Sequence, residues 1–361
     1  MYETCGVCWY SSKATPENLS SAQKKMQTPE LREGSKLVSP TSQRTYTIIK
    51  GCGRGSFGTV YKCKASDSGN LFALKLVDTL HAKDQLDMIL QEIAVTQKAH
   101  RLSDNRSPQT HEAFVIQTPT KGKNRQVIVI VMDYIDGITL SALIADDKPL
   151  CETMTLHILH EVASGLIGMH AHGLIHRDIK SANILLSRSG EVYLCDFGVS
   201  KVISECSPAT NTLSGTPLWM APEMISGKPY NEAVDLYSLG ITAVEIVTGH
   251  PPVPTMAAGS ENNQDIMNGL RSRARNIPVM DKRKFSKEFR EIITACLTID
   301  PNARMSASSL LDRVNACFQV STNPIAAGSG SISSAKTNAS HSAGSFNLKH
   351  ALGELVKLNC I

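Results

Sequence analysis

The spacing of apolar residues along the chain predicts mainly strands first and mainly helices afterwards. Residues 127–132 form an unbroken apolar run, Val-Ile-Val-Ile-Val-Met, which is typical of a strand buried on both faces. Apolar residues recur with helical spacing in residues 85–98, 153–170 and 233–247. A strand-rich part followed by a helix-rich part favours an α+β fold with two lobes and a cleft between them.

The two ends of the chain differ in composition from its middle. Residues 1–44 are rich in Ser, Thr, Pro, Lys and Gln and show little periodicity, so we expect residues 1–45 to form a disordered tail. Residues 319–345 are rich in Ser, Gly and Ala, which is typical of a flexible linker. The leucines within residues 346–361 fit a short amphipathic helix that could dock on a partner, and they equally fit a frayed end.

Size and hydrophobicity are those of a globular protein. The chain has 361 residues, of which 42% are hydrophobic, enough for the core of one two-lobed domain of roughly 250–300 residues. Its longest apolar runs are far shorter than the roughly 20 residues that span a bilayer, and its first residues lack the pattern of a secretory signal. We therefore expect a soluble, intracellular, cytoplasmic protein without a membrane span.

Positive charge is concentrated in one short stretch. The net charge is +4, and residues 271–287 carry seven Lys or Arg side chains against the single carboxylate of Asp281. A nucleic-acid surface would be larger and would have aromatic residues among its basic ones, so we expect no nucleic-acid partner. The stretch fits either a solvated loop or a docking surface for an acidic partner.

A glycine-rich segment lies between two strand-like segments. Gly53, Gly55 and Gly58 have the spacing Gly-X-Gly-X-X-Gly, and glycines let the backbone come close to a polyphosphate. A dinucleotide-binding domain uses the same spacing, but there the glycines open a helix, whereas residues 59–63 are strand-like. No Gly-Lys-Ser/Thr follows, which excludes a Walker A loop. We therefore favour a glycine-rich β-hairpin.

A lysine, Lys75, lies among apolar neighbours in the strand-like segment 72–75. A buried ammonium group without a partner is costly, so Lys75 needs an acidic neighbour. Glu92 on the predicted helix 85–98 is the candidate, and the pair would direct Lys75 toward nucleotide phosphates. The alternative for Glu92 is an ordinary surface position on that helix.

The most specific chemistry is carried by residues 176–183, His-Arg-Asp-Ile-Lys-Ser-Ala-Asn, with Asp-Phe-Gly at 196–198 and Ala-Pro-Glu at 221–223 further on. Asp178 supplies a carboxylate that can accept a hydroxyl proton. A lysine, an amide and the second carboxylate, Asp196, follow it. These are the groups needed to move a metal-bound phosphoryl group onto an alcohol.

Together these motifs resemble those of the eukaryotic protein kinases, over residues 46–318. The resemblance implies a kinase fold, with a small β-rich lobe at residues 46–135 and a larger helical lobe at residues 136–318. It also implies ATP and Mg²⁺ as cofactors and protein serine and threonine residues as substrates.

The resemblance gives each matching residue a role. Asp178 orients the substrate hydroxyl and accepts its proton, Lys180 steadies the γ-phosphate, and Lys75 with Glu92 holds the α- and β-phosphates. The implied Mg²⁺ ligands are Asn183 and Asp196. The residues implied to bind the nucleotide are Cys52, Gly53, Arg54, Gly55, Ser56, Phe57, Gly58, Val60, Ala73, Lys75, Met132, Asp133, Ile135 and Leu185.

Regulatory positions are implied as well. Thr212 lies where an activating phosphate is carried in similar kinases, and Arg177 would pair with that phosphate. Thr216 resembles the threonine that hydrogen-bonds Asp178 and the following lysine. Glu223 and Arg304 resemble a buried ion pair of the large lobe. A further carboxylate, Asp235, resembles the aspartate that braces the backbone of the catalytic loop.

Several shorter segments narrow the resemblance. Residues 215–223, 238–245 and 296–301 look like those of the sterile-20-like kinases, which act upstream in MAP-kinase cascades, and MAP kinase kinase kinases are the next-nearest group. An upstream kinase or regulatory partner could bind the tails or the basic stretch 271–287. The span between His100 and Met132 is longer than in typical members.

Two alternatives to an active protein kinase remain. The first is a pseudokinase that acts as a nucleotide-gated scaffold. Such proteins usually lack a residue that corresponds to Lys75, Asp178 or Asp196, and all three are present here. A kinase of small metabolites is disfavoured because residues 215–223 resemble a platform for a peptide substrate.

Overall fold

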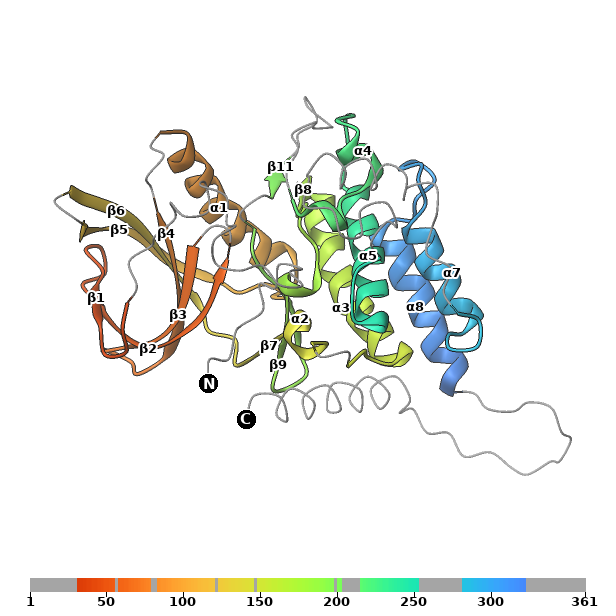
Figure 1. Cartoon of the computed structure of the whole chain (residues 1–361), viewed down its shortest axis with the longest axis horizontal. Helices are drawn as coiled ribbons and strands as arrows, with labels where there is room; N and C mark the ends of the chain where they lie inside the picture. The colour runs from red at the N-terminus through yellow and green to blue at the C-terminus, as the bar shows by residue number, and fades with distance from the viewer. Residues whose placement is uncertain are drawn as a thin grey trace, which may run out of the picture. The chain divides into compact units, whose positions relative to one another are not determined.

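The computed structural model describes residues 31–55, 58–78, 83–120, 123–145, 148–197, 200–202, 215–252 and 281–322. The predicted linker from residue 323 onward, the predicted C-terminal helix and residues 1–30 lie outside this range. The chain divides into two compact units, the first within Met1–His100 and Ser107–Asp136 and the second within Arg101–Arg106 and Gly137–Ile361. Strands dominate the first unit and helices the second (Figure 1), which confirms the predicted α+β fold.

The first unit is built on a six-stranded antiparallel sheet in the order β1-β2-β3-β4-β6-β5. Its strands are β1 (Lys36–Val38), β2 (Thr45–Gly55), β3 (Gly58–Ala65), β4 (Leu71–Asp78), β5 (Thr110–Thr120) and β6 (Lys123–Asp133). Strands β2 and β3 pair up to Gly55 and Gly58, so the glycine-rich segment belongs to a hairpin, as predicted. The long span after His100 forms the extended β5–β6 hairpin.

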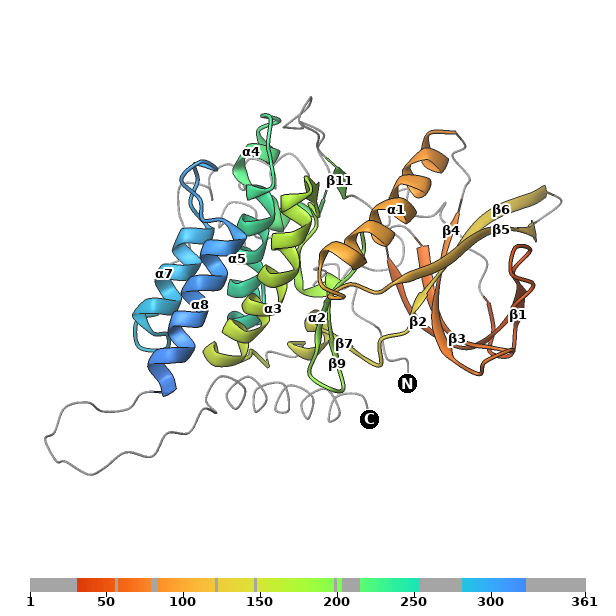
Figure 2. The same cartoon turned by 180° about the vertical axis from the view of Figure 1, so that it is seen from behind.

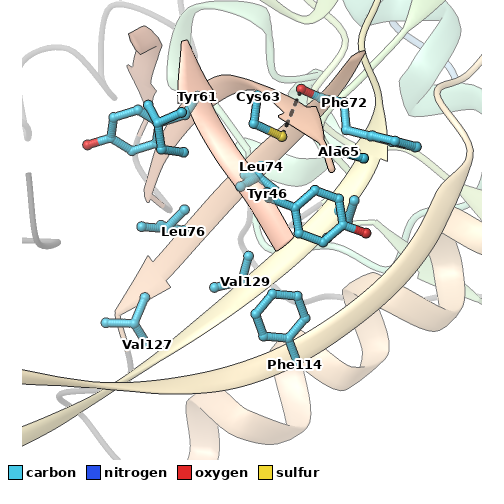
Figure 3. Close-up of a cluster of buried hydrophobic side chains, with 12 residues drawn as sticks. Tyr46, Tyr61, Cys63, Ala65, Phe72, Leu74, Leu76, Phe114, Val127 and Val129 are labelled. Atoms are coloured by element: carbon cyan, nitrogen blue, oxygen red, sulfur yellow. Dashed lines mark hydrogen bonds between the residues drawn. The ribbon is translucent and has the colours of Figure 1, made fainter. Parts of the chain in front are cut away.

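Strand β6 is buried on both faces, as its apolar run predicts. Val127, Val129 and Val131 join a cluster of aromatic and aliphatic side chains from β2, β3, β4 and β5 (Figure 3). The isoleucines between these valines point to the other face, where Ile93 of helix α1 (Lys83–Leu102) packs against them. Successive residues of a strand point to opposite faces, so one strand contributes to two cores.

Side chains join the two edges of this sheet. Glu112 on the edge strand β5 accepts hydrogen bonds from Ser39 Oγ (2.8 Å) and Ser42 Oγ (3.0 Å), which follow β1 at the other edge. The Tyr46 hydroxyl of β2 donates to the same carboxylate, and its ring stacks on Phe114 with centroids 6.5 Å apart. The sheet is therefore curled around the cluster shown in Figure 3.

The predicted tail of residues 1–45 is wrong for its last part, because Lys36–Val38 forms β1 and pairs with β2. Strand β1 has three residues, of which only the middle one is partly buried. So short a segment shows no apolar period, and its pairing with β2 determines its conformation.

The second unit surrounds helix α5 (Ala233–Thr248). Every residue from Val234 to Val247 is buried, which is typical of a helix inside a core. Helices α3 (Glu152–Ala171) and α5 confirm the predicted helical segments, and α3 packs against α8 (Ala307–Thr322), as Figure 2 shows from behind. Helix α8 continues past residue 318, so the linker predicted from residue 319 begins too early.

The remaining elements of the second unit are short, apart from α7. They are β7 (Gly137–Thr139), α2 (Leu140–Leu143), β8 (Leu174–Ile175), η2 (Ser181–Asn183), β9 (Ile184–Ser187), β10 (Val192–Leu194), β11 (Lys201–Val202), η3 (Pro217–Trp219), α4 (Pro222–Ile225) and α7 (Lys287–Cys296). None of the helices within the described residues is long and apolar enough to cross a membrane.

Candidate active site

A buried carboxylate on α5 holds the loop that follows β8. Asp235 Oδ1 accepts a hydrogen bond from the backbone N–H of Arg177 (2.8 Å), and Oδ2 accepts from the backbone N–H of His176 (2.9 Å). His170 Nε2 of α3 donates to Oδ2 as well (2.8 Å). Burial raises the pKa of Asp235, but His170 and His176 outweigh it, so the pKa lies below its ordinary value and the carboxylate stays charged.

His176 is neutral and connects the loop to the segment before Asp196. Burial lowers the pKa of His176. Its Nδ1 accepts from the N–H of Asp178 (3.3 Å), so the ring proton lies on Nε2, which donates to the carbonyl of Cys195 (3.1 Å). The N–H of Cys195 donates to the carbonyl of Asn183 (2.8 Å). Two hydrogen bonds therefore fix the residue that precedes Asp196.

Two residues of the site have a left-handed backbone, Arg177 with φ 68° and Asp196 with φ 64°. This conformation costs about 1–3 kcal/mol in a residue other than glycine, so it persists only where the surroundings fix it. Asp235 holds Arg177. The Phe197 ring packs edge-on against His176, with centroids 4.8 Å apart, beside Asp196.

Polar side chains converge on Asp178. Lys180 Nζ donates to Asp178 Oδ2 (2.7 Å) and to Thr216 Oγ1 (2.6 Å). The Thr216 hydroxyl donates to Asp178 Oδ1 (2.6 Å), and Asn183 Nδ2 donates to Oδ2 (2.9 Å). The hydrogen bonds expected of Thr216 are thus present. An oriented carboxylate beside an ammonium group can accept a hydroxyl proton while an anion is held close by.

Glycine is required at the residue before Thr216. Gly215 has φ 114°, and a Cβ there would lie 2.4 Å from the carbonyl oxygen of Arg177. A side chain would therefore push Thr216 away from the loop that carries Asp178.

Glu245 on α5 is a site residue that sequence reasoning missed. Its carboxylate accepts from Ser181 Oγ (2.5 Å), from the N–H of Ser181 (3.3 Å) and from Trp219 Nε1 (2.9 Å). It therefore joins the loop that carries Asp178 to η3. Burial raises the pKa of Glu245 despite these donors. The available signal was an acidic residue within an apolar helix, because a buried carboxyl group needs partners.

Arg177 is buried with spare hydrogen-bonding capacity. Its Nη1 donates to the Tyr230 hydroxyl (3.2 Å), and its Nε has no hydrogen-bond partner among the described residues. Thr212 lies outside those residues, so the predicted pairing of its phosphate with Arg177 stays a prediction.

The buried ion pair that the sequence predicts for the second unit is present. Arg304 donates from two nitrogens to the two oxygens of Glu223, at 2.6 and 3.1 Å. It also donates to the backbone carbonyls of Ala233, Thr298 and Ile299. Helix α4, which directly follows the Thr216 segment, is thereby fixed to α5 and to the loop before α8.

In the first unit, four residues predicted to bind nucleotide lie on one face of the sheet. Val60 is directly opposite Lys75, and Ala73 is directly opposite Met132. Opposed residues of antiparallel strands point to the same face, and Ala73 and Lys75 are two residues apart on β4. Lys75 is 8% exposed, so it is buried as predicted. The face is opposite the cluster of Figure 3.

Gly58 is fixed by the packing of neighbouring strands. It has φ 152°, and a Cβ there would lie 2.0 Å from the carbonyl oxygen of Leu76 on β4. Cys52 lies at a bulge of β2, where the register shifts between Gly51 and Gly53. Leu185 lies on β9 of the second unit.

The other residues predicted to bind nucleotide lie at the end of β6 or outside the described ranges. Asp133 ends β6 and Ile135 follows it in the first unit. The structure does not describe Ser56 and Phe57. It describes the backbone of Arg54, Gly55 and Glu92 but not the surroundings of these residues. The ion pair between Lys75 and Glu92 therefore stays a prediction, and so does docking at the basic stretch, whose residues 271–280 are also outside.

Asn183 and Asp196 suit Mg²⁺ by their chemistry. The described residues contain no group of three or more His, Cys, Asp or Glu side chains that could hold a metal ion. Mg²⁺ needs no such group, because it takes oxygen ligands and usually keeps waters and substrate phosphates beside one or two carboxylates. The Asn183 amide nitrogen donates to Asp178, which leaves its carbonyl oxygen as the atom that could bind a cation.

Comparison with known proteins gives consistent matches. The family model of the protein kinase domain matches residues 46–314. The chain is 36% identical over 273 residues to the serine/threonine-protein kinase sid1 of Schizosaccharomyces pombe, covering 75% of this chain and 54% of that protein, so it spans about half the length of this relative. It is 32% identical to the serine/threonine-protein kinase ppk11 of the same yeast, covering 73% and 79%. It is 34% identical to Misshapen-like kinase 1 of Rattus norvegicus, covering 70% and 18%.

Replacing Asp235 with asparagine tests the support of the loop. The new amide would offer one acceptor oxygen where three N–H groups now point, so at least one buried donor would lose its partner. We expect Asp235→Asn to lower the free energy of unfolding by about 2–4 kcal/mol, measured by urea denaturation.

The matched control is Asp281→Asn, because Asp281 accepts the N–H of Arg283 (2.9 Å) at an exposed position. It should change the stability by less than about 0.5 kcal/mol. Equal stabilities of the two variants would contradict the role given to Asp235.

Proposed function

Because the chain belongs to the protein kinase family, we propose that it is an active serine/threonine protein kinase of the sterile-20-like group, transferring the γ-phosphoryl group of ATP to protein hydroxyls. The observation that carries this proposal is the geometry around Asp178. Its carboxylate accepts hydrogen bonds from the side chains of Lys180, Asn183 and Thr216, which orient it.

In this reaction the residues of the second unit handle the hydroxyl and the charge. Asp178 would orient the incoming serine or threonine hydroxyl and accept its proton. Lys180 would move from its present partners, Asp178 and Thr216, to the γ-phosphate, because a hydrogen bond from an ammonium group to a charged phosphate is strong. Asn183 and Asp196 would hold Mg²⁺, which when bound neutralises phosphate charge.

In the first unit the proposed nucleotide surface is the face that carries Val60, Ala73, Lys75 and Met132. Its small and apolar side chains suit the flat adenine ring, and the buried Lys75 suits a phosphate. The glycine-rich hairpin would direct backbone N–H groups at the phosphates. Asp133 and Ile135 add to this surface at the end of β6. Leu185 belongs to the second unit and is a proposed adenine contact from the kinase resemblance alone.

Replacing Thr216 tests the proton-accepting cluster. Thr216→Val keeps the shape of the side chain and removes the hydroxyl that joins Asp178 to Lys180. A hydrogen bond to a charged group contributes about 1.5–3 kcal/mol. If this orients Asp178 for reaction, kcat for phosphorylation of a generic basic protein should fall about ten- to hundredfold.

Thr216→Ser is the matched control, since it retains the hydroxyl and should retain most of the activity. Unchanged kcat in Thr216→Val would count against the proposed role of the cluster. Steady-state rates with radiolabelled ATP at saturating Mg²⁺ distinguish the two results.

Regulation by a phosphate on Thr212 is part of the proposal. Arg177 supports it, because this buried cation donates to the Tyr230 hydroxyl while its Nε has no hydrogen-bond partner among the described residues. A phosphate brings about −1.5 to −2 of charge and can order a loop by pairing with an arginine.

We expect Thr212→Ala to lower kcat markedly, with unchanged stability. The measurement is the activity of this variant beside wild type whose loop phosphorylation has been mapped by mass spectrometry. Full activity of wild type with an unmodified Thr212 would show that the loop needs no phosphate.

The cellular setting is proposed from similarity. A role in a MAP-kinase-type cascade, a cytoplasmic location and activation by an upstream kinase fit the sterile-20-like resemblance. The alternative is a scaffold without catalysis. The complete set of Lys75, Asp178, Asn183 and Asp196 favours catalysis over it.

A further inference from the structure

The side chain of Asp133 is held in place by β5 and by the residue that precedes this strand. Its Oδ1 accepts a hydrogen bond from His111 Nε2 (2.6 Å), and its Oδ2 accepts from the backbone N–H of Gln109 (2.9 Å). The N–H of Asp133 donates in turn to the carbonyl of Gln109 (3.0 Å). Three hydrogen bonds therefore fix both the backbone and the side chain of one residue at the end of β6.

His111 reaches Asp133 because of a bulge in β5. Thr110 is opposite Met132 and Glu112 is opposite Val131, so His111 is an extra residue without a partner of its own in the ladder. A bulge redirects the side chain of its extra residue. Here it places the imidazole next to the last residue of β6 instead of in the regular alternation of β5.

The imidazole is also held from its other side. Its ring lies edge-on to Phe72, with centroids 5.1 Å apart and planes at 85°. Phe72 is a core residue of β4 and lies directly opposite Asp133 of β6. Its ring packs against Tyr46. The orientation of His111 therefore depends on the aromatic core of the first unit.

The next residue is restrained by the same sheet. Lys62 Nζ of β3 lies 4.2 Å from the centre of the Tyr134 ring, as in a cation–π contact. The first two residues of the segment 133–135 thus have their side chains held by β5 and β3. Neither side chain is free to rotate without losing a contact, so the backbone between them is restricted as well.

We propose that His111 is a positioning residue for nucleotide binding, because it fixes the backbone of residues 133–135 in the orientation that receives the adenine ring. The inference rests on the proposed ATP-dependent function and adds a residue outside the kinase motifs. Binding to a segment that is already ordered avoids the entropy cost of ordering it when the nucleotide arrives. Loss of the hydrogen bond should weaken nucleotide binding and leave the chemical step unchanged.

Two amide side chains of different length provide the test. In His111→Gln the amide nitrogen lies as far along the side chain as Nε2 does, so it can reach Asp133. In His111→Asn it is one bond shorter and cannot. Both His111 and Asp133 are about one-third exposed, at 31% and 37%, so we expect a modest effect.

The KM for ATP should rise about two- to fivefold in His111→Asn and stay near the wild-type value in His111→Gln. The kcat at saturating ATP should be unchanged in both variants. The Kd for ADP, measured by calorimetry, should follow the KM, which provides a readout independent of turnover.

Asp67→Asn is the control for a general loosening of the sheet. Arg44 pairs with Asp67 in the same unit (2.7 Å), with similar exposures of 33% and 47%. Asp67→Asn should leave both KM and Kd unchanged. The inference is overturned if His111→Asn binds nucleotide as tightly as wild type, or if His111→Gln is weakened as much as His111→Asn. Wild type that neither binds ADP nor transfers phosphate would instead overturn the proposed function itself.

Discussion

The carboxylate of Asp235 determines the conformation of the loop on which the proposed chemistry depends. It is fully buried on a helix that is itself buried, and it receives the N–H groups of two consecutive residues, His176 and Arg177. A charged group in such surroundings needs several hydrogen bonds to remain charged, and the loop backbone supplies them. The same two bonds allow Arg177 to keep its left-handed backbone. Asp178 is the next residue, so its position depends on this conformation.

The site extends from this point through backbone contacts more than through side-chain packing. His176 joins the loop to Cys195, and Cys195 joins it to Asn183, so the residue before Asp196 is bonded on both sides. Glu245, further along the same helix as Asp235, holds Ser181 and Trp219. Helix α5 thus supports both the loop that carries Asp178, the proposed proton acceptor, and the segment after Gly215. A substitution on α5 is expected to change several functional residues together.

The parts that could be predicted from the sequence contain either a motif or a long regular pattern of apolar residues. The buried strand at 127–132, the helices α3 and α5, the Thr216 contacts and the Glu223–Arg304 pair all appear as expected. A motif predicts such contacts because it specifies both the residue types and their spacing.

The features that were not predicted from the sequence depend on contacts between distant parts of the chain. Strand β1 has too few residues to show a period, and it forms because β2 is available for pairing. His111 reaches Asp133 through a bulge, and a bulge is not encoded by any apolar pattern. Glu245 could be recognised as unusual within an apolar helix, but its partners come from segments 26 and 64 residues away.

The most direct measurement is phosphate incorporation from [γ-³²P]ATP, with Mg²⁺, into a generic basic protein by wild type and by Asp178→Asn. Asparagine keeps the size of the side chain and cannot accept the hydroxyl proton as a carboxylate does. The account predicts label on serine and threonine with wild type and its loss, by a factor of about 10² or more, with Asp178→Asn. Equal incorporation by both proteins, under conditions where wild type is active, would contradict the assignment of Asp178 as the proton acceptor.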